Sequence, residues 1–552
     1  MSCNLSLVTL TAFSIQFSIH GMKKRGLVHP SSVHTDEDRD VVRKFGRNTN
    51  IEGINNAGRA EDRTRLVIWL TIFLFLVALT LYDLTQLVQD YLSNPVDVST
   101  TLQHENAIDF PSVTVCNRNI VSCKRLKTFI EKCSDIEFCS HKKELEELLV
   151  LGRCEEEKPP DFTPPQLQEE DVKGSDDIFE RRKERQELMS KNKDEVHADL
   201  KSQNQSKAFI SGQTFLLTYL KLNERERITI GHNIRDLIVS CTFRGVDCKT
   251  SLTTNSASFM DYITNTTNFG NCYTLYTRNE VLGKSSLTGP EFGLSLVLNI
   301  QQSHYLKDVT SMAVGARVSV QDRQTFPLIE EYGVDLAPGS LTSLSLQMVK
   351  ISRHEYTGCQ VTEWSESKYE DQLSDQHKED YRYSISMCQR SCVQQTIQTQ
   401  CGCSHPMFET DKQGYQYCDL VQDTDQRDCV STIIVEYDIG ERSCECGPPC
   451  MEVEYEKLVS STLWPSRQST LAFSELYNVD PVEVKDDYLR LDVYFMSLNV
   501  KTVTETARYT LTTFISAIGG SLGVWVGFSV CMMFELLELL VDLGISCLKR
   551  DK

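Results

Sequence analysis

Several features of enzymes and of nucleic-acid-binding proteins are missing from this sequence. It has no metal-ligand cluster, no nucleophile elbow and no phosphate-binding loop, so we expect neither an enzyme nor a bound metal or cofactor. Lysines and arginines number 57 against 77 acidic residues, and the formal net charge of −20 disfavours binding to nucleic acid. The 552 residues are nevertheless enough for more than one domain.

Charged side chains are absent from two long stretches, residues 66–82 and residues 509–534. Both approach or exceed the roughly 20 residues that an apolar helix needs to cross a bilayer. We therefore predict two transmembrane helices, 66–92 and 508–542; buried core helices are the alternative. The first 19 residues resemble a signal peptide but have no basic residue before the apolar part, so we do not expect cleavage there.

Basic residues beside the two stretches predict the orientation of the chain. Ten lysines and arginines precede the first stretch and three follow the second. Because basic flanks prefer the cytoplasmic side, we predict a plasma-membrane protein whose residues 1–65 and 543–552 are cytosolic and whose residues 93–507 are extracellular. Two predicted glycosylation sites, Asn204 in NQS and Asn265 in NTT, fall in this extracellular part.

Cysteine usage agrees with an extracellular middle part. Of the 21 cysteines, eighteen lie between Cys116 and Cys450, and they predict up to nine disulfides in an oxidising compartment. Zinc binding is the alternative for CGC (401–403) and CECGPPC (444–450). It is disfavoured because neither motif has a matching CxxC pair.

The extracellular part combines helical and alternating patterns. Residues 118–235 are predicted to form a finger-like region that carries a charged, solvated insertion at 155–207. Residues 359–450 are predicted to form a cysteine-dense, thumb-like region, in which Cys388 and Cys392 share a helix face. Alternating apolar residues predict strands at 110–116, 237–243, 293–300, 315–320, 341–351 and 489–506. We predict an α+β fold, with a central β-sheet and peripheral helices joined by disulfides.

Four glycines interrupt the second apolar stretch: Gly519, Gly520, Gly523 and Gly527. Glycine weakens a helix, so their presence in a membrane span requires a reason. The last three fall at i, i+3 and i+7 and would share one face of a continuous helix. Gly523 and Gly527 also have the GxxxG spacing that lets helices approach closely.

Eight short motifs follow one another along almost the whole chain. They are HG (20–21), RLVIW (65–69), FPSVTVCN (110–117), GNCYTLY (270–276), CQRSC…CGC (388–403), CECGPPC (444–450), WPS (464–466) and IGGSLGVWVGFS (518–529). Each is a weak signal alone, but in this order and spacing they resemble the degenerin/epithelial sodium channel superfamily, which includes acid-sensing and peptide-gated channels. The resemblance implies a subunit of a trimeric, sodium-selective channel with two spans and a large disulfide-rich ectodomain.

The resemblance assigns roles to residues of the second stretch. Gly527, Phe528 and Ser529 match the Gly-x-Ser selectivity filter of the family, where small residues expose backbone groups to an ion. Ser516 matches the degenerin site, at which bulky side chains favour opening. The family often has an aspartate next, whereas this chain has Ala517, which leaves amiloride sensitivity open. Helix packing without a pore is the alternative.

Two further groups are expected near the inner end of the pore. Glu535, Glu538 and Asp542 are spaced three and four residues apart, on one helix face. Three copies would form a carboxylate ring that attracts cations; a solvated helix end is the alternative for Asp542. His20 and Gly21 match the cytosolic gating motif of the family.

The family pattern also implies disulfide partners. The seven implied pairs are Cys116–Cys272, Cys241–Cys248, Cys359–Cys450, Cys388–Cys446, Cys392–Cys444, Cys401–Cys429 and Cys403–Cys418. Cys123, Cys133, Cys139 and Cys154 are left over. They are even in number and close in sequence, so we expect two further disulfides among them, with the pairing undetermined.

The resemblance implies a coupling pair but leaves the gating ligand open. Tyr91, above the first span, and Tyr356, before Cys359, match an aromatic pair that couples the outer helices to the first span. Acid-sensing members have a histidine pair where this chain has Pro95 and Val96, so we favour a neuropeptide over protons. A proton-gated or constitutively active channel and, in a different class, a non-conducting receptor are the alternatives. The expected partners are two further subunits, identical or related, and membrane lipid.

Overall fold

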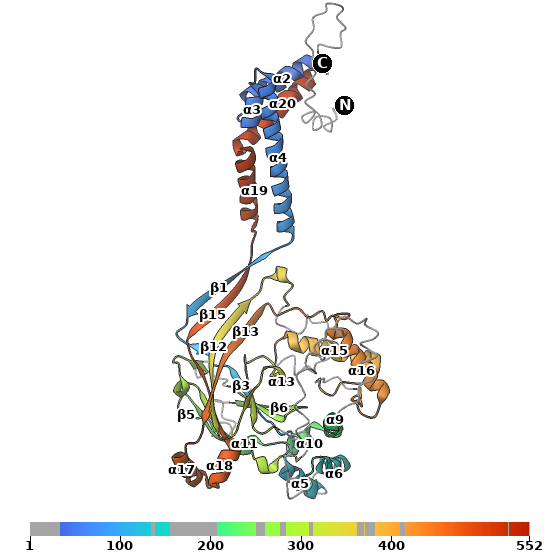
Figure 1. Cartoon of the computed structure of the whole chain (residues 1–552), viewed down its shortest axis with the longest axis vertical. Coiled ribbons are helices and arrows are strands. Elements are labelled where there is room, and N and C mark those ends of the chain that lie inside the picture. Colours follow the sequence, from blue (N-terminus) through green and yellow to red (C-terminus); the bar gives the residue numbers. More distant parts are fainter. Residues whose placement is uncertain are drawn as a thin grey trace, which may run out of the picture. The chain divides into compact units, whose positions relative to one another are not determined.

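The computed structural model describes residues 34–133, 139–154, 207–249, 260–276, 283–307, 313–360, 369, 381–408, 414–527 and 529–550. The chain divides into two compact units, Met1–Asp97 together with Ala507–Lys552, and Val98–Thr506. The first is termed the helical unit and the second the disulfide-rich unit. Figure 1 labels their elements.

The helical unit contains the predicted first span. Helix α4 covers Arg63–Leu92, three residues more at its start than the predicted 66–92, and its 30 residues extend about 45 Å. The helix ends before Asn94, which has a positive φ of 49°, and Pro95, which cannot continue a helix. Among the described residues, α4 is the one helix long and apolar enough to cross a bilayer.

The structure corrects the expectation of one continuous helix over 508–542. Two helices occupy this segment, the apolar α19 (Leu511–Val526) and α20 (Val530–Arg550). The physical reason is Gly527, whose φ of +65° is a conformation that glycine adopts without steric cost and that ends a helix. In Figure 1, α19 runs beside α4, and the two helices are in contact.

Two short helices precede α4, in a segment that the sequence analysis predicts only to be cytosolic. Helix α2 covers His34–Asn48 and α3 covers Glu52–Gly58. Helix α3 packs against α4 and α2 packs against α20. The approach of α3 is close, because a side chain at Gly53 would overlap the ring of Phe73.

The core of the disulfide-rich unit is an eight-stranded sheet. Seven strands run in the order β1-β15-β12-β14-β9-β4-β5, and β13 pairs with β12. Their bounds are β1 Val96–His104, β15 Asn499–Ala507, β12 Ser340–Ser352, β14 Tyr488–Phe495, β9 Leu294–Asn299, β4 Ile238–Phe243, β5 Val246–Asp247 and β13 Met451–Leu463. Strand β12 holds this sheet together: β13 pairs with it antiparallel over its full length, and β14 and β15 pair with it parallel.

A second sheet in the same unit has five strands, which alternate along the chain with those of the first sheet. Its order is β11-β10-β3-β7-β6, and β2 and β8 form a separate two-stranded pair. The bounds are β2 Ile108–Asp109, β3 Ser112–Asn117, β6 Met260–Thr266, β7 Gly270–Tyr276, β8 Lys284–Ser285, β10 Ala316–Gln321 and β11 Val334–Leu336. Every residue of β3 is buried, as its apolar, β-branched sequence predicts.

Helices surround the two sheets and have small cores of their own. The finger-like region contains α5 Cys123–Lys132, α6 Lys142–Leu151, α9 Lys207–Leu220, α10 Glu224–Ile230 and α11 Ile234–Leu237. Elsewhere in the described part of the unit, the α-helices are α13 Ile329–Tyr332, α15 Ile385–Cys401, α16 Thr424–Asp438, α17 Arg467–Tyr477 and α18 Pro481–Asp487. Leu126, Leu145, Leu148 and Tyr219 are fully buried in the finger-like region.

Nine disulfides join the eighteen cysteines between Cys116 and Cys450. Seven of them are the pairs that the family resemblance implies, and the other two are Cys123–Cys154 and Cys133–Cys139. Along α15, two consecutive turns are tied to the segment 444–446 through Cys388–Cys446 and Cys392–Cys444. The thumb-like region is thus held by covalent bonds as well as by packing.

Candidate functional site

The second apolar segment is broken at residues 527–529. Helix α19 ends at Val526, and the N–H of Gly527 donates to the Leu522 carbonyl to close its last turn. Helix α20 begins at Val530. Gly527 and Ser529, two of the three predicted filter residues, therefore form the break itself, while Phe528 lies outside the described residues.

One face of α19 carries small side chains and no packing partner within the described chain. Ser516, Gly519, Gly520 and Gly523 fall at i, i+3, i+4 and i+7, so they share this face, and all four are exposed. At each of the three glycines, apart from the adjoining residues and the backbone of α19 itself, no described heavy atom lies within 4 Å of the position that a Cβ would take. The structure thus corrects the predicted face, because Gly527 ends the helix instead of extending the row. We call these four residues the glycine face.

The opposite face of α19 contacts α4 through side chains. The ring of Phe514 stacks on that of Tyr91, with centroids 4.1 Å apart and an interplanar angle of 22°. Nearer the C-terminal end of α19, the indole N–H of Trp525 donates to Oδ2 of Asp83 on α4 at 2.5 Å. The sequence analysis missed Asp83 and Trp525, although Asp83 is the first charged residue after the uncharged stretch 66–82.

The three predicted inner-mouth carboxylates lie on α20 but have different surroundings. Glu535 accepts hydrogen bonds from the hydroxyl of Thr49 (3.0 Å), the backbone N–H of Asn50 (3.1 Å) and the side-chain amide of Asn50. Glu538 and Asp542 are exposed. Glu535 therefore joins α20 to the link between α2 and α3. The sequence analysis missed Thr49 and Asn50, and no spacing rule would have paired them with a carboxylate almost 500 residues away.

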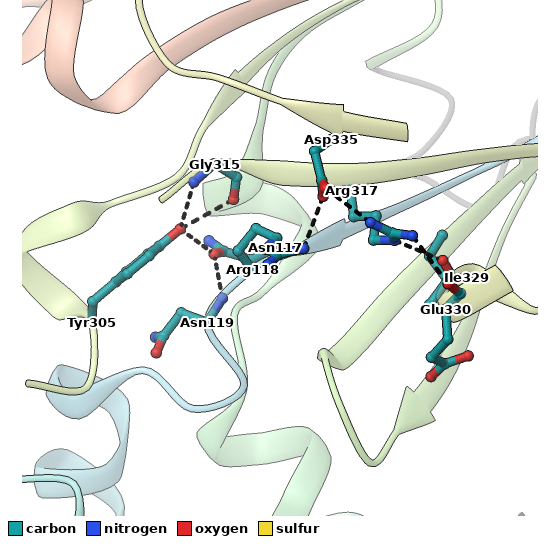
Figure 2. A network of polar contacts seen from close by, with 9 residues as sticks. All are labelled: Asn117, Arg118, Asn119, Tyr305, Gly315, Arg317, Ile329, Glu330 and Asp335. Carbon is teal, nitrogen blue, oxygen red and sulfur yellow. Dashed lines mark hydrogen bonds and ion pairs between the residues drawn. The ribbon is translucent and has the colours of Figure 1, made fainter. Parts of the chain in front are cut away.

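A buried polar network surrounds the end of β3, where the motif FPSVTVCN finishes (Figure 2). Oδ1 of Asn117 accepts from the hydroxyl of Tyr305 (2.5 Å) and from the backbone N–H of Asn119 (3.0 Å). The Nδ2 of Asn117 donates to the carbonyl of Ile300 at 2.8 Å. Burial raises the pKa of Tyr305 above its usual range, so its hydroxyl stays protonated and can donate.

The same network continues through two arginines that share one carboxylate, as Figure 2 shows. Arg118 and Arg317 each place a guanidinium nitrogen 2.9 Å from a different oxygen of Asp335. Arg317 also donates to the carbonyls of Ile329 (2.8 Å) and Glu330 (3.0 Å), at the start of α13. Strand β10 therefore fixes the position of α13.

Helix α13 in turn pairs with the thumb-like region. The guanidinium of Arg390, on α15, lies 2.9 Å from a carboxylate oxygen of Glu331 and 3.8 Å from one of Glu330. A continuous set of hydrogen bonds and ion pairs thus runs from β3 and β10 through α13 to α15. These contacts connect α15 of the thumb-like region to the five-stranded sheet.

The predicted glycan acceptor Asn265 lies on β6 with its side chain engaged. Its Nδ2 donates to the hydroxyl of Tyr219 (2.9 Å) and to Oδ1 of Asn271 (2.9 Å). A glycan is attached through this nitrogen, so glycosylation would require both hydrogen bonds to change. Asn204 lies outside the described residues. Glycosylation at both positions stays a prediction.

Comparison with known proteins shows the family of this chain. A family model described as "Amiloride-sensitive sodium channel" matches residues 45–539, and the chain belongs to this family. The match starts after His20 and Gly21, which also lie outside the described residues, so their gating role stays a prediction.

Individual relatives agree with the family match. The chain is 26% identical over 544 residues to the epithelial sodium channel subunit alpha of Xenopus laevis, covering 92% of this chain and 82% of that protein. It is 28% identical to degenerin unc-8 and 29% identical to degenerin mec-10 of Caenorhabditis elegans, each over 58% of this chain. These two matches span only 41% and 44% of the degenerins. A solved proton-activated chloride channel has a TM-score of 0.28 and 6% identity, which is too weak to carry an argument.

The Tyr91–Phe514 stack suggests an energetic test at the outer end of the spans. Replacing either ring with alanine should weaken evoked current, and the pair should show a coupling free energy of about 0.5–1.5 kcal/mol, the usual range for stacked rings. A double-mutant cycle on current activation, with surface protein quantified, measures it. The same cycle run on Tyr91 and Tyr356 tests the coupling pair that the resemblance implies. Strictly additive effects in the second cycle would contradict that pair.

Proposed function

We propose that the chain is one subunit of a trimeric, sodium-selective cation channel of the plasma membrane. The observation that supports this most is the break at 527–529, which directly follows the helix that carries the glycine face. Backbone that leaves the helical hydrogen-bonding pattern at membrane depth is tolerated only where it is buried in protein or lines a water-filled path. A path lined by small residues would let an ion contact these freed backbone groups.

The glycine face supports assembly with other subunits. Within the described chain its glycines meet no neighbour, so they are not explained by packing against α4. Three copies of the face around a common axis would close a narrow path, since glycines let helices approach closely. Relatives of this chain are named as subunits alpha, beta and gamma of a channel, which agrees with assembly from identical or related copies.

The basic flanks of the two apolar segments support cytosolic termini and an extracellular disulfide-rich unit. Nine disulfides in that unit fit an oxidising compartment. Filter residues Gly527–Ser529 would then lie within the membrane. Glu538 and Asp542 would lie beyond the filter toward the cytosol, where exposed carboxylates attract cations.

An extracellular ligand, of which a neuropeptide is favoured, is the proposed opener. Two buried histidines, His232 and His405, are unsuited to be proton sensors. Burial lowers the pKa of His232 to about 3 and that of His405 to about 4, so both stay neutral in mildly acidic solution.

Gating or modulation by protons is the second candidate, and one site favours it. Burial, together with the neighbouring carboxylates of Glu452 and Glu456, raises the pKa of Glu454, against a smaller opposing effect of Arg353. These three acids alternate along β13, so they share one face of the strand. A carboxyl with a raised pKa takes up its proton at a higher pH than a free one.

Recording current from cells that express the chain tests the proposal. We expect an inward current that disappears when external sodium is replaced by a large organic cation and falls strongly when it is replaced by potassium. A neuropeptide panel and steps to acid pH, applied separately, distinguish the two openers. Uninjected cells and surface biotinylation are the controls. Normal surface protein without current under any condition would favour a non-conducting receptor instead.

A further inference from the structure

Asp83 places a carboxylate within the first span, and the described contacts give it one partner on the second. It follows directly after the uncharged stretch 66–82 and lies well inside α4, nine residues before its end. Ionisable groups at such positions are costly and are normally bound to a partner. The partner is Trp525, whose indole nitrogen lies 2.5 Å from Oδ2 of Asp83. Both side chains are half-buried.

The depth of this pair can be read from the two helices. The Tyr91–Phe514 stack ties the outer ends of α4 and α19. Asp83 is eight residues from Tyr91, about 12 Å along the helix, and Trp525 is eleven residues from Phe514, about 16 Å. The two side chains span the remaining few ångströms. The hydrogen bond therefore lies at the last turn of α19, two residues before Gly527.

We propose that Asp83 is a positioning residue for the selectivity filter; this rests on the channel function proposed above. Gly527 and Ser529 lie outside both helices and are bonded to their ends, Gly527 to Leu522 of α19 and Ser529 to Met532 of α20, so their position depends on where these helix ends lie. On the inner side, Glu535 is held by Thr49 and Asn50. On the outer side, Asp83 holds Trp525 and thereby fixes where α19 ends.

Three substitutions separate positioning from a simple effect of charge. Asp83→Asn removes the charge but keeps a side-chain oxygen that accepts from the indole. Asp83→Ala removes both the charge and the acceptor. Trp525→Phe removes the donor and leaves the carboxylate. Positioning predicts that the alanine and phenylalanine variants behave alike and that the asparagine variant resembles the wild type.

The test is the Na⁺/K⁺ permeability ratio of the full chain in cells, from reversal potentials at equal surface expression. We expect Asp83→Ala and Trp525→Phe each to lower the ratio by about tenfold, the order expected when a hydrogen bond to a charged group is lost. The double variant should be no worse than the worse single, and Asp83→Asn should stay within about twofold. Trp69→Phe, the same substitution at a tryptophan of α4 that is remote from Asp83, is the matched control and should leave the ratio unchanged.

Two results would overturn the proposal. One is a wild-type ratio in both Asp83→Ala and Trp525→Phe at normal surface expression. The other is an equal loss in Asp83→Asn and Asp83→Ala with no effect of Trp525→Phe, which would mean that the charge acts alone.

A second readout separates this inference from the channel function itself. A wild-type chain that reaches the surface without sodium current would contradict the channel function. In that case the rate at which a thiol reagent labels a cysteine at position 529 still tests whether Asp83 positions this segment. In a Cys531→Ser background, the labelling rate of Ser529→Cys should change with Asp83→Ala and with Trp525→Phe but not with Asp83→Asn. Equal rates in all four proteins would overturn the positioning role.

Discussion

Replacing Ser529 with glutamine is expected to lower the Na⁺/K⁺ permeability ratio steeply or to abolish the current. Ser529 is the last residue of the break, directly before α20 begins at Val530. A longer side chain there would fill a path whose walls are otherwise small, and would change how many waters an ion keeps. Discrimination of about tenfold corresponds to only about 1.4 kcal/mol, so a modest displacement is sufficient. Bi-ionic reversal potentials measure the ratio.

The conservative variant Ser529→Ala is the matched control, because it keeps the small volume and the backbone conformation. It should retain most of the sodium preference. Surface biotinylation is needed for both variants, since a loss of current alone would not distinguish a blocked path from a protein retained inside the cell. A Ser529→Gln channel that conducts with the wild-type permeability ratio would show that the filter lies elsewhere.

Periodic patterns predicted many elements of the fold because burial follows them closely. In β9 the three leucines Leu294, Leu296 and Leu298 are fully buried and the residues between them are half-buried, which is the alternation of a strand with two unequal faces. Helix α4 was similarly predictable from the sequence, since a long uncharged apolar stretch nearly always forms a membrane-spanning helix or a buried core helix. These elements depend on local sequence alone.

Strand β13 was missed although its signal is present. Glu452, Glu454 and Glu456 alternate with Val453 and Tyr455, which is the period of a strand. Residues 489–506 were in turn predicted as one strand and form two, β14 and β15. Both pair with β12, and a single straight strand could not pair with it twice in parallel at different registers.

The candidate site was predictable in its residues but not in its geometry. The small residues and the Gly-x-Ser motif located the filter, yet the same glycines fit a continuous helix equally well until the φ of Gly527 is known. Contacts such as Trp525 with Asp83 and Glu535 with Asn50 join residues more than 400 positions apart. Such pairs depend on how the helices meet, and periodicity within one segment carries no information about that.

Replacing Ser516 with phenylalanine is expected to hold the channel open without ligand. Ser516 is exposed on the glycine face of α19, so a larger side chain fits within one subunit and should not disturb its fold. The crowding arises when three glycine faces meet in the closed state. Overpacking costs about 1–3 kcal/mol per site, so three copies would destabilise the closed state by about 3–9 kcal/mol. Changing an equilibrium from 1:99 to 99:1 takes about 5.5 kcal/mol, which lies within that range.

The measurement is ligand-free current at equal surface expression, compared with Leu511→Phe as the matched control. Leu511 is also exposed on α19, about 140° around the helix from Ser516 and about 80° from Gly519, the nearest residue of the glycine face. The control adds bulk on the same helix but outside the proposed contact between subunits, so it should be silent until ligand is applied. A large standing sodium current in Ser516→Phe only would support the closed contact between glycine faces. If Ser516→Phe is gated normally, or if Leu511→Phe is equally active, the glycine face does not form the closed gate.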